Sequence, residues 1–354
     1  MEQRILGRTG LSVTAVALGG ARLGEVPGQE IETVRRALDL GVNFIDTARA
    51  YGNSEEFIGK AIAGIPKTFA IATKSLPVSR DQTLRDLETS LLNLGLEKVD
   101  LLYVHSCETE ERVEATLKPG GVLDACRDAQ KQGLTDFIGV SFNHLISVGL
   151  LERIARLIKT DEFDVIQVPL NLVRTELVDS EVIPLAISRN LGVVVNYPTV
   201  DGLLAKEWGV FRPIFERYAR TPGQAALLYL LAHEGVHTVL SGMSTPQVAS
   251  ENVEAGEGIA RLSHEERRRV IDDVAALGLG PCRSCGICHP YTHGIPVARI
   301  MMFYDMAERF GIAGAKEQYR AYRESVLACD DLSEADRVCP QRFDVLKMLR
   351  EVHT

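Results

Sequence analysis

Four ionisable side chains stand at the ends of three consecutive apolar runs in the first third of the sequence. Asp46 and Tyr51 follow the first of these runs, Lys74 ends the second, and His105 ends the third. A tyrosine, with an ordinary pKa of about 10, donates its proton readily at neutral pH only where a cation stabilises the phenolate. We expect Lys74 to be that cation, Asp46 to hold Lys74, and His105 to donate to an oxygen that gains charge. The set suits protonation of a carbonyl oxygen while hydride reaches its carbon.

The elements that must position these groups are short apolar runs alternating with amphipathic stretches, up to about residue 275. Eight such runs end at Leu18, Ile45, Thr73, Val104, Val140, Val168, Asn196 and Leu240. Near-continuous β-branched runs are typical of parallel strands buried on both faces, and the stretches between them are long enough for helices. The pattern predicts an α/β protein with a (β/α)8 barrel, whose reacting groups lie at the strand ends. A doubly wound sheet is the alternative, but it leaves those residues unexplained.

Two further segments flank the expected barrel. The stretch RILGRTGLSV, with Gly7 and Gly10 between apolar residues, predicts a hairpin that plugs the bottom of the barrel. Beyond Leu277 the sequence becomes rich in Gly, Pro and Cys and then shows helical periodicity. We therefore expect a barrel over residues 1–277 and a small, mainly helical domain over residues 278–354.

Composition excludes several classes of protein. The 354 residues are 45% hydrophobic, which supports a sizeable core and excludes a disordered chain. The net charge of -9 offers no general basic field for nucleic acid or an anionic membrane. The first apolar run, Val13–Leu18, is far too short for a membrane span. We expect a soluble cytoplasmic protein, in which the odd count of seven cysteines indicates a metal or redox role over a disulfide framework.

Longer motifs around the four ionisable residues resemble the aldo-keto reductases. They are GVNFIDTARAYGNSEEFIGKAI from Gly41 to Ile62, IATKS around Lys74 and LLYVHS around His105, with LGRTGLSV, IGVS, YPTVDGLL and GMSTPQVASEN elsewhere. The resemblance covers roughly three quarters of the chain. It implies a (β/α)8 barrel and reduction of a carbonyl by NAD(P)H, or the reverse oxidation of an alcohol. It makes Tyr51 the general acid, Lys74 and Asp46 its tuning pair, and His105 the group that orients the substrate.

The same resemblance implies a set of cofactor contacts. The residues that match are Gly20, Asp46, Ser141, Gln167, Tyr197, Pro198, Gly202, Leu203, Gly242, Ser244, Glu251 and Asn252. Ser141 and Gln167 would hold the carboxamide, and Tyr197 would stack under the nicotinamide ring. The loop at residues 198–204 would face the pyrophosphate, and the last four residues of the set would surround the adenosine.

The sequence departs from the family pattern at two cofactor positions. Many relatives have Asn directly after the serine of the GVS segment, whereas this chain has Phe142, with Asn143 one step later. Where NADPH-preferring members often carry a basic residue, this chain has Val248. A 2′-phosphate would lack its usual bidentate partner there, so NADH is slightly preferred over NADPH, unless Arg22 or another loop cation substitutes.

The cysteines of the last quarter follow an incomplete ferredoxin pattern. Cys282, Cys285 and Cys288 have the spacing C-x2-C-x2-C, and Cys339 precedes a proline. In two-cluster ferredoxins the fourth cysteine of each run ligates the other run's cluster. One complete set of four ligands therefore survives, while Cys329 belongs to a lost second site. The tail resembles the ferredoxin-like extension of a subset of aldo-keto reductases and implies one [4Fe–4S] cluster, with zinc as the alternative.

The expected partner is a small carbonyl or alcohol substrate, with a sugar or polyol preferred. Hydride transfer moves two electrons at once and needs no one-electron relay, so a cluster would chiefly stabilise a small domain. Exchange of electrons with a redox protein partner is the other use of such a cluster. Two alternatives to an enzyme stay open, a nicotinamide-binding redox sensor without turnover and an electron-transfer protein that works through the cluster.

Overall fold

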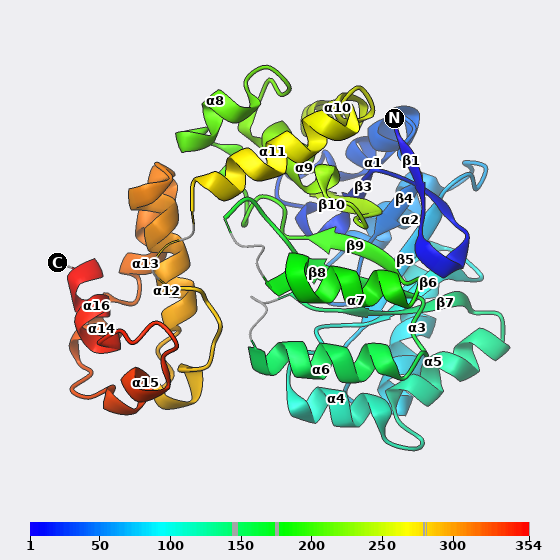
Figure 1. Ribbon diagram of the computed structural model, residues 1–354. Coiled ribbons are helices and arrows are strands. Elements are labelled where there is room, and N and C mark those ends of the chain that lie inside the picture. The colour runs from blue at the N-terminus through cyan, green and yellow to red at the C-terminus, as the bar shows by residue number, and fades with distance from the viewer. Residues whose placement is uncertain (144–147, 174–176, 279, 281, 354) are drawn as a thin grey trace.

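Eight parallel strands close into a barrel at the centre of the molecule (Figure 1). The computed structural model describes residues 1–143, 148–173, 177–278, 280 and 282–353. The barrel strands are β3 (Val16–Gly19), β4 (Phe44–Asp46), β5 (Ala70–Ser75), β6 (Val99–Val104), β7 (Thr135–Ser141), β8 (Val165–Pro169), β9 (Gly192–Asn196) and β10 (Thr238–Gly242). Each strand pairs with its neighbours in chain order, and β10 pairs with β3 to close the ring. The predicted (β/α)8 barrel is therefore confirmed.

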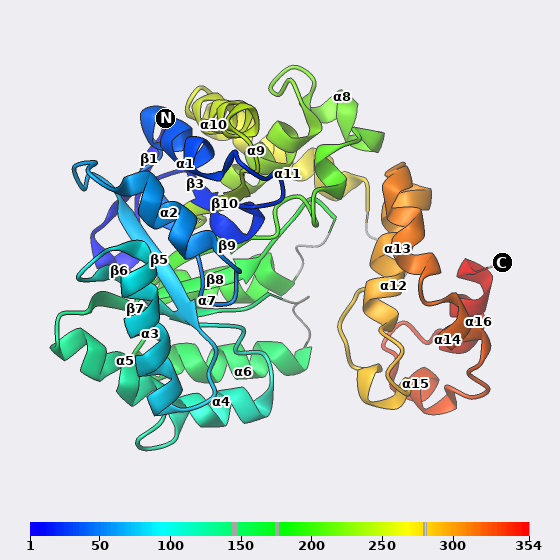
Figure 2. The same cartoon turned by 180° about the vertical axis from the view of Figure 1, so that it is seen from behind.

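Helices surround this barrel and connect its strands (Figures 1 and 2). They are α1 (Glu30–Asp39), α2 (Ser54–Ile62), α3 (Arg80–Leu94), α4 (Glu110–Leu117), α5 (Val122–Lys131), α6 (Val148–Lys159), α7 (Ile183–Ser188), α8 (Arg212–Phe215), α9 (Pro222–Ala232), α10 (Pro246–Ala260) and α11 (His264–Ala276). Side-chain caps fix several starts. Thr221 accepts a hydrogen bond from the backbone N–H of Gln224 at the start of α9, and Ser263 forms a capping box with Glu266 at the start of α11.

The N-terminal hairpin fills one end of the barrel. Strands β1 (Gln3–Ile5) and β2 (Ser12–Thr14) pair in antiparallel fashion, which confirms the predicted hairpin. Leu6 and Val13 belong to the apolar cluster inside the barrel, together with Phe44 and Tyr103. Gly7 adopts a φ of +50°, and a Cβ there would lie 2.3 Å from the backbone nitrogen of Gly192. The close approach explains the glycine and closes this end of the barrel.

The chain beyond α11 forms a lobe of helices beside the barrel, orange to red in Figures 1 and 2. Its helices are α12 (Val297–Tyr304), α13 (Lys316–Arg320), α14 (Arg323–Leu327), α15 (Ser333–Val338) and α16 (Val345–Val352). The lobe contacts the loop after β9, where Val210 N–H donates to the Phe310 carbonyl at 3.0 Å and Ala313 N–H donates to Glu207 at 2.7 Å. The described part of this lobe is helical, as expected, while its ferredoxin-like character and the boundary at residue 278 stay predictions.

Within the residues that the structure describes, no helix combines the length and the apolar content that crossing a bilayer would need.

Candidate active site

Three neighbouring strands bring the four sequence-predicted residues to the same end of the barrel. Asp46 is the last residue of β4, Lys74 lies in β5, and His105 directly follows β6. Tyr51 comes from the connection between β4 and α2. Because these strands are parallel and adjacent, their carboxyl ends meet at one edge, which is where barrel enzymes place their chemistry.

Lys74 and Asp46 form a buried ion pair at the base of this site. The Lys74 ammonium contacts the Asp46 carboxylate and donates to the backbone carbonyl of Thr47 at 2.7 Å. The second carboxylate oxygen of Asp46 accepts a hydrogen bond from Gln167 at 2.9 Å. Lys74 and Asp46 are each 1% exposed, so the pair is shielded from water. An ion pair this buried is held in one geometry by its own hydrogen bonds.

Tyr51 lies against this pair and beside the imidazole. The Lys74 nitrogen is 4.9 Å from the centre of the Tyr51 ring, and the ring of His105 stands edge-on to Tyr51 at 5.7 Å between centres. Burial raises the pKa of the Tyr51 phenol above its ordinary value, and Lys74 opposes that rise. From the sequence, we predicted that Lys74 would lower the pKa of Tyr51 below its ordinary value. In this structure burial outweighs the cation, because desolvation penalises the phenolate.

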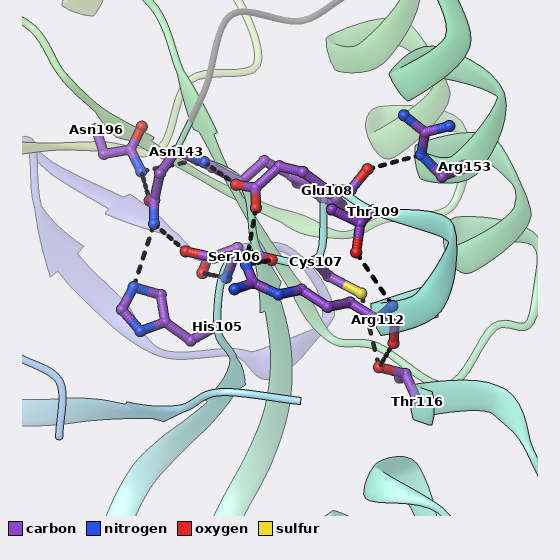
Figure 3. A network of polar contacts seen from close by, with 12 residues as sticks. His105, Ser106, Cys107, Glu108, Thr109, Arg112, Thr116, Asn143, Arg153 and Asn196 are labelled. Atoms are coloured by element: carbon purple, nitrogen blue, oxygen red, sulfur yellow. Dashed lines mark hydrogen bonds and ion pairs between the residues drawn. The ribbon is translucent and has the colours of Figure 1, made fainter. Parts of the chain in front are cut away.

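His105 is a neutral imidazole whose ring contacts the side chain of Asn143 (Figure 3). Burial, together with Lys74 and Arg112, lowers the pKa of His105 to about 3. Its Nε2 atom lies 3.2 Å from the Asn143 side-chain nitrogen, and its buried Nδ1 atom contacts no polar partner in the described chain. A neutral ring can donate one hydrogen bond and accept another.

A cleft of about 700 Å³ opens beside these residues along the carboxyl ends of the strands. Most of the residues expected to bind the cofactor line it. They are Asp46, Gln167, Tyr197, Pro198, Gly202, Gly242, Ser244, Glu251 and Asn252. Tyr51 and Asn143 border the same cleft, so the expected acid and the expected cofactor contacts share one space.

Three expected cofactor residues are not among those that line the cleft. Ser141 is fully buried, and its hydroxyl accepts the Ser106 backbone N–H at 3.1 Å. Gly20 is also buried, and a Cβ there would lie 2.6 Å from the Ser54 hydroxyl. The Leu203 side chain faces the C-terminal lobe, where it comes within contact distance of a Cβ built on Gly314. These three residues therefore lie outside the lining of the cleft.

Sequence reasoning missed several polar residues of the cleft. The residues not singled out for cofactor binding include Asn196, Lys206, Thr221 and Ser241, whereas Thr199 and Asp201 belong to the loop at residues 198–204 that was expected to face the pyrophosphate. Asn196 ends the VVVN run, so the strand-end argument that found Asp46 would have found it. Its Oδ1 atom is buried without a partner in the described chain, which leaves one acceptor free for a ligand amide.

Arg22 also borders the cleft, but carboxylates engage its guanidinium. It contacts Glu25, and it donates to Asp201 at 3.3 Å. Val248 lines the same cleft and offers no charge. The expected substitute cation for a 2′-phosphate is thus already paired in this structure.

The four cysteines predicted as ligands surround one cavity in the C-terminal lobe. Cys282, Cys285, Cys288 and Cys339 line a space of about 260 Å³ together with mainly apolar neighbours. Burial raises the pKa of the Cys288 thiol to about 11, and the three nearby thiols add to the rise. The backbone N–H of Ser284 donates to the Cys282 sulfur at 3.5 Å. The chain therefore gathers these thiols around a common space.

The other three thiols lie apart from this cavity. Cys329 does not line it and contacts the Asp331 carbonyl at 3.7 Å. Burial raises the pKa of Cys107 to about 11 and that of Cys126 to about 12. Within the described ranges, no three or more Cys, His, Asp or Glu side chains are placed to hold a single metal ion.

Comparison with known proteins identifies the barrel. The profile of the Aldo/keto reductase family matches residues 15–272. The chain belongs to the aldo/keto reductase family. The match spans Asp46, Tyr51, Lys74 and His105, and it ends inside α11, before the cysteine-lined cavity.

Named relatives of this aldo/keto reductase include oxidoreductases. L-galactose dehydrogenase of Arabidopsis thaliana is 30% identical over 315 residues, which cover 78% of this chain and 94% of the relative. Methylglyoxal reductase DkgB of Salmonella typhimurium is 27% identical over 245 residues, or 68% of this chain and 86% of the relative. The prediction of an enzyme of the aldo-keto reductase class is confirmed.

Solved structures share the barrel fold. An aldo-keto reductase from Klebsiella pneumoniae in complex with NADPH has a TM-score of 0.65 at 21% identity, covering 80% of this chain and 98% of that one. One from Bacillus halodurans has a TM-score of 0.65 at 22% identity, covering 80% and 99%. At this level of sequence identity, the structural similarity establishes the fold alone.

Proposed function

We propose that this protein is an NAD(P)-dependent oxidoreductase that reduces an aldehyde, ketone or sugar carbonyl to an alcohol, or runs the reverse reaction, with Tyr51 as general acid and base. The observation that supports this most is the buried Lys74–Asp46 pair against the Tyr51 ring, at the border of the cleft. The cleft suits a dinucleotide, because the free acceptor of Asn196 borders it together with the polar side chains of Ser244, Glu251 and Asn252.

The chain's own residues would manage the proton in this reaction. When bound, the nicotinamide supplies or takes up the hydride at the reacting carbon. Tyr51 would give its phenolic proton to the carbonyl oxygen, and Lys74 would stabilise the phenolate left behind. Asp46 would hold Lys74 in place through their ion pair, while His105, as a neutral ring, would orient the substrate oxygen without adding a second cation. In the reverse direction Tyr51 accepts the proton of the alcohol.

Several cleft residues would hold the cofactor. Gln167 and Asn196 offer amide groups for the carboxamide, and the exposed ring of Tyr197 offers a stacking surface. We propose a slight preference for NADH over NADPH, because Val248 is neutral and Arg22 is already paired with Glu25 and Asp201. A ratio of dissociation constants that favours NADPH would contradict this preference.

We propose a sugar or polyol as the preferred substrate. The name of the 30% identical plant relative, L-galactose dehydrogenase, supports this class. Turnover with sugars, polyols and small aldehydes, followed by nicotinamide absorbance, would test it. Turnover confined to simple aldehydes would contradict the proposal.

The decisive variant for the reaction is Tyr51→Phe. It removes one hydroxyl and leaves the ring against Lys74, so cofactor binding is expected to stay within about twofold. Turnover is expected to fall by at least about 100-fold, the usual contribution of a positioned general acid. Tyr218→Phe, in the connection before α9, is the matched control and should keep full turnover. Unchanged turnover in Tyr51→Phe would exclude this tyrosine as the acid.

For the C-terminal lobe, we propose one [4Fe–4S] cluster held by Cys282, Cys285, Cys288 and Cys339. The cavity that these thiols line supports it, and so does the N–H donated to the Cys282 sulfur. Zinc, which also takes four thiolate ligands, is the alternative occupant of the same cavity. When bound, a cluster can exchange single electrons, but its main role here would be to stabilise a small lobe.

Iron counting separates these possibilities. Anaerobically purified protein should hold about four irons per chain with matching sulfide. Cys339→Ser should lose them, whereas Cys329→Ser, in the same lobe but outside the cavity, should keep them. Zinc in place of iron, or full iron in Cys339→Ser, would contradict the ligand set. Lower thermal stability of the lobe without iron would support the structural role over a redox partner.

A further inference from the structure

A continuous series of hydrogen bonds joins the imidazole of His105 to the buried carboxylate of Asp46 through three amide side chains. The Asn143 nitrogen lies 3.2 Å from His105 Nε2, and the Asn143 oxygen lies 3.0 Å from the Asn196 nitrogen. The Asn196 nitrogen in turn lies 3.3 Å from the Gln167 oxygen, and the Gln167 nitrogen lies 2.9 Å from Asp46. Figure 3 shows the part of this series from His105 to Asn196.

The ends of the series fix the direction of every amide in it. A carboxylate only accepts hydrogen bonds, so Gln167 must present its NH2 group to Asp46 and its oxygen to Asn196. Asn196 cannot be turned round, because its NH2 group also donates to the backbone carbonyl of Phe142 at 3.0 Å. Asn143 must therefore offer its oxygen to Asn196 and its NH2 group to His105.

A second set of contacts holds Asn143 in this position. Its NH2 group also donates to the Ser106 hydroxyl, and its backbone N–H donates to Glu108 at 2.6 Å. Ser106 has a φ of +55°, in the left-handed region that is strained for a non-glycine residue. The Ser141 hydroxyl accepts the Ser106 backbone N–H at 3.1 Å. Arg112 donates to the Ser106 backbone carbonyl at 2.7 Å (Figure 3).

We infer that Asn143 is a positioning residue that fixes His105 in the tautomer with its proton on Nδ1 and its lone pair on Nε2. A proton on Nε2 would set two N–H groups against each other across 3.2 Å, whereas a lone pair there accepts the Asn143 hydrogen. The consequence for the reaction rests on the proposed function. His105 can donate from Nε2 to a substrate oxygen only after Asn143 has turned away and the ring has exchanged its proton from Nδ1 to Nε2, so Asn143 holds the ring in the tautomer that cannot donate from Nε2.

Nitrogen-15 NMR of histidine-labelled protein tests the assignment directly, because the shifts of the two ring nitrogens report which one carries the proton. The signals of His105 are those lost in His105→Gln. Ligand-free protein is expected to show a protonated Nδ1 and an unprotonated Nε2. In Asn143→Asp the carboxylate can only accept, so the proton should move to Nε2. Asn190→Asp makes the same change in an exposed residue just before β9, at the opposite end of the barrel, and should leave both signals unchanged.

A protonated Nε2 in the unmodified protein, or an unchanged tautomer in Asn143→Asp, would overturn the inference. If Asn143→Asp fails to fold, Asn143→Ala replaces it, since this variant removes the donor without adding charge and should also populate the proton on Nε2. Tyr51→Phe separates this inference from the proposed function. Its His105 tautomer should match that of the unmodified protein while turnover is lost, and retained turnover would refute the role of Tyr51 without touching the tautomer.

Discussion

Replacing Lys74 with methionine would test the buried ion pair as a source of both stability and catalysis. Methionine keeps most of the side-chain volume but removes the cation. The Asp46 carboxylate, which is 1% exposed, would then have the Gln167 hydrogen bond but no opposite charge beside it. Removing one partner of a buried pair costs about 3–5 kcal/mol, because the remaining charge is uncompensated. With an unfolding entropy of about 2.1 cal/mol/K per residue, 1 kcal/mol shifts the melting temperature of 354 residues by roughly 1.3 °C, so it should fall by about 4–7 °C.

The double variant Lys74→Met with Asp46→Asn separates the charge from the packing. The asparagine oxygen can still accept the Gln167 hydrogen, and no buried charge is left, so most of the lost stability should return, to within about 1–2 kcal/mol. Turnover should not return, since the Tyr51 phenolate still lacks its cation, and we expect it to stay at least about 100-fold below the unmodified enzyme. Urea unfolding followed by circular dichroism and nicotinamide-linked turnover give the two readouts.

A surface pair provides the control for this cycle. Lys98 contacts Asp136 at 2.8 Å on the outside of the barrel, where solvent screens the charges. Lys98→Met should leave the unfolding midpoint and the turnover unchanged. If the single variant Lys74→Met and the double variant have the same free energy of unfolding, the lost stability comes from packing and not from the unpaired carboxylate. Full turnover in Lys74→Met would refute the tuning of Tyr51 by this cation.

Three further outcomes follow from single positions. The pKa of His105 is about 3 in the folded protein, against an ordinary value near 6.5. As the pH falls from about 6.5 towards 3, the unfolded chain therefore binds a proton that the folded chain does not, and up to about 5 kcal/mol of stability is lost. Urea midpoints should therefore fall more in the unmodified protein than in His105→Gln between about pH 7.5 and 4.5, and equal falls would contradict the assignment. Val248→Arg should improve binding of NADPH relative to NADH by about tenfold in fluorescence titrations, whereas an unchanged ratio would place the 2′-phosphate elsewhere. Gly7→Ala should lose about 1–3 kcal/mol in unfolding, since a Cβ would meet Gly192, and Gly10→Ala, with open space around it, should lose less.

The barrel could be predicted because its strands leave a strong mark in the sequence. Each strand is buried on both faces and therefore reads as a short β-branched run, with a polar residue where the run meets the barrel mouth. The run ending at Ile45, for example, is followed by Asp46, which is the last residue of β4. Two of the eight predicted strand ends, Val104 and Asn196, match the structure, and the others fall one or two residues short, because polar side chains such as Ser75 and Ser141 still belong to the hydrogen-bonded ladders.

The protonation state of the site could not be predicted in the same way. The sequence places Lys74 near Tyr51, but the net direction of the phenol pKa depends on how much water the fold excludes from the ring. Burial is a property of the whole barrel mouth, to which distant loops contribute. The same holds for His105, whose pKa of about 3 reflects burial first and the cations Lys74 and Arg112 second.

The grouping of the cysteines was predictable for a different reason. Three of them are fixed in one short loop by their spacing, and the cavity that they line also includes Cys339, which follows α15. The position of this cavity relative to the barrel was not predictable. It depends on contacts such as those of Glu207 with Ala313 and Gly314, which join segments far apart in the sequence and leave no local pattern.

Asn143 lies one residue later than the asparagine that follows the GVS serine in many aldo-keto reductases, and strand geometry explains what this shift does. Along an extended chain, residues two positions apart point the same way, and the residue between them points to the opposite face. Ser141 and Asn143 accordingly both contact Ser106, while Phe142 between them is fully buried. An amide directly after Ser141 would occupy the face that Phe142 fills. The shift therefore moves the amide onto the side of the β6 end, where His105 lies within its reach.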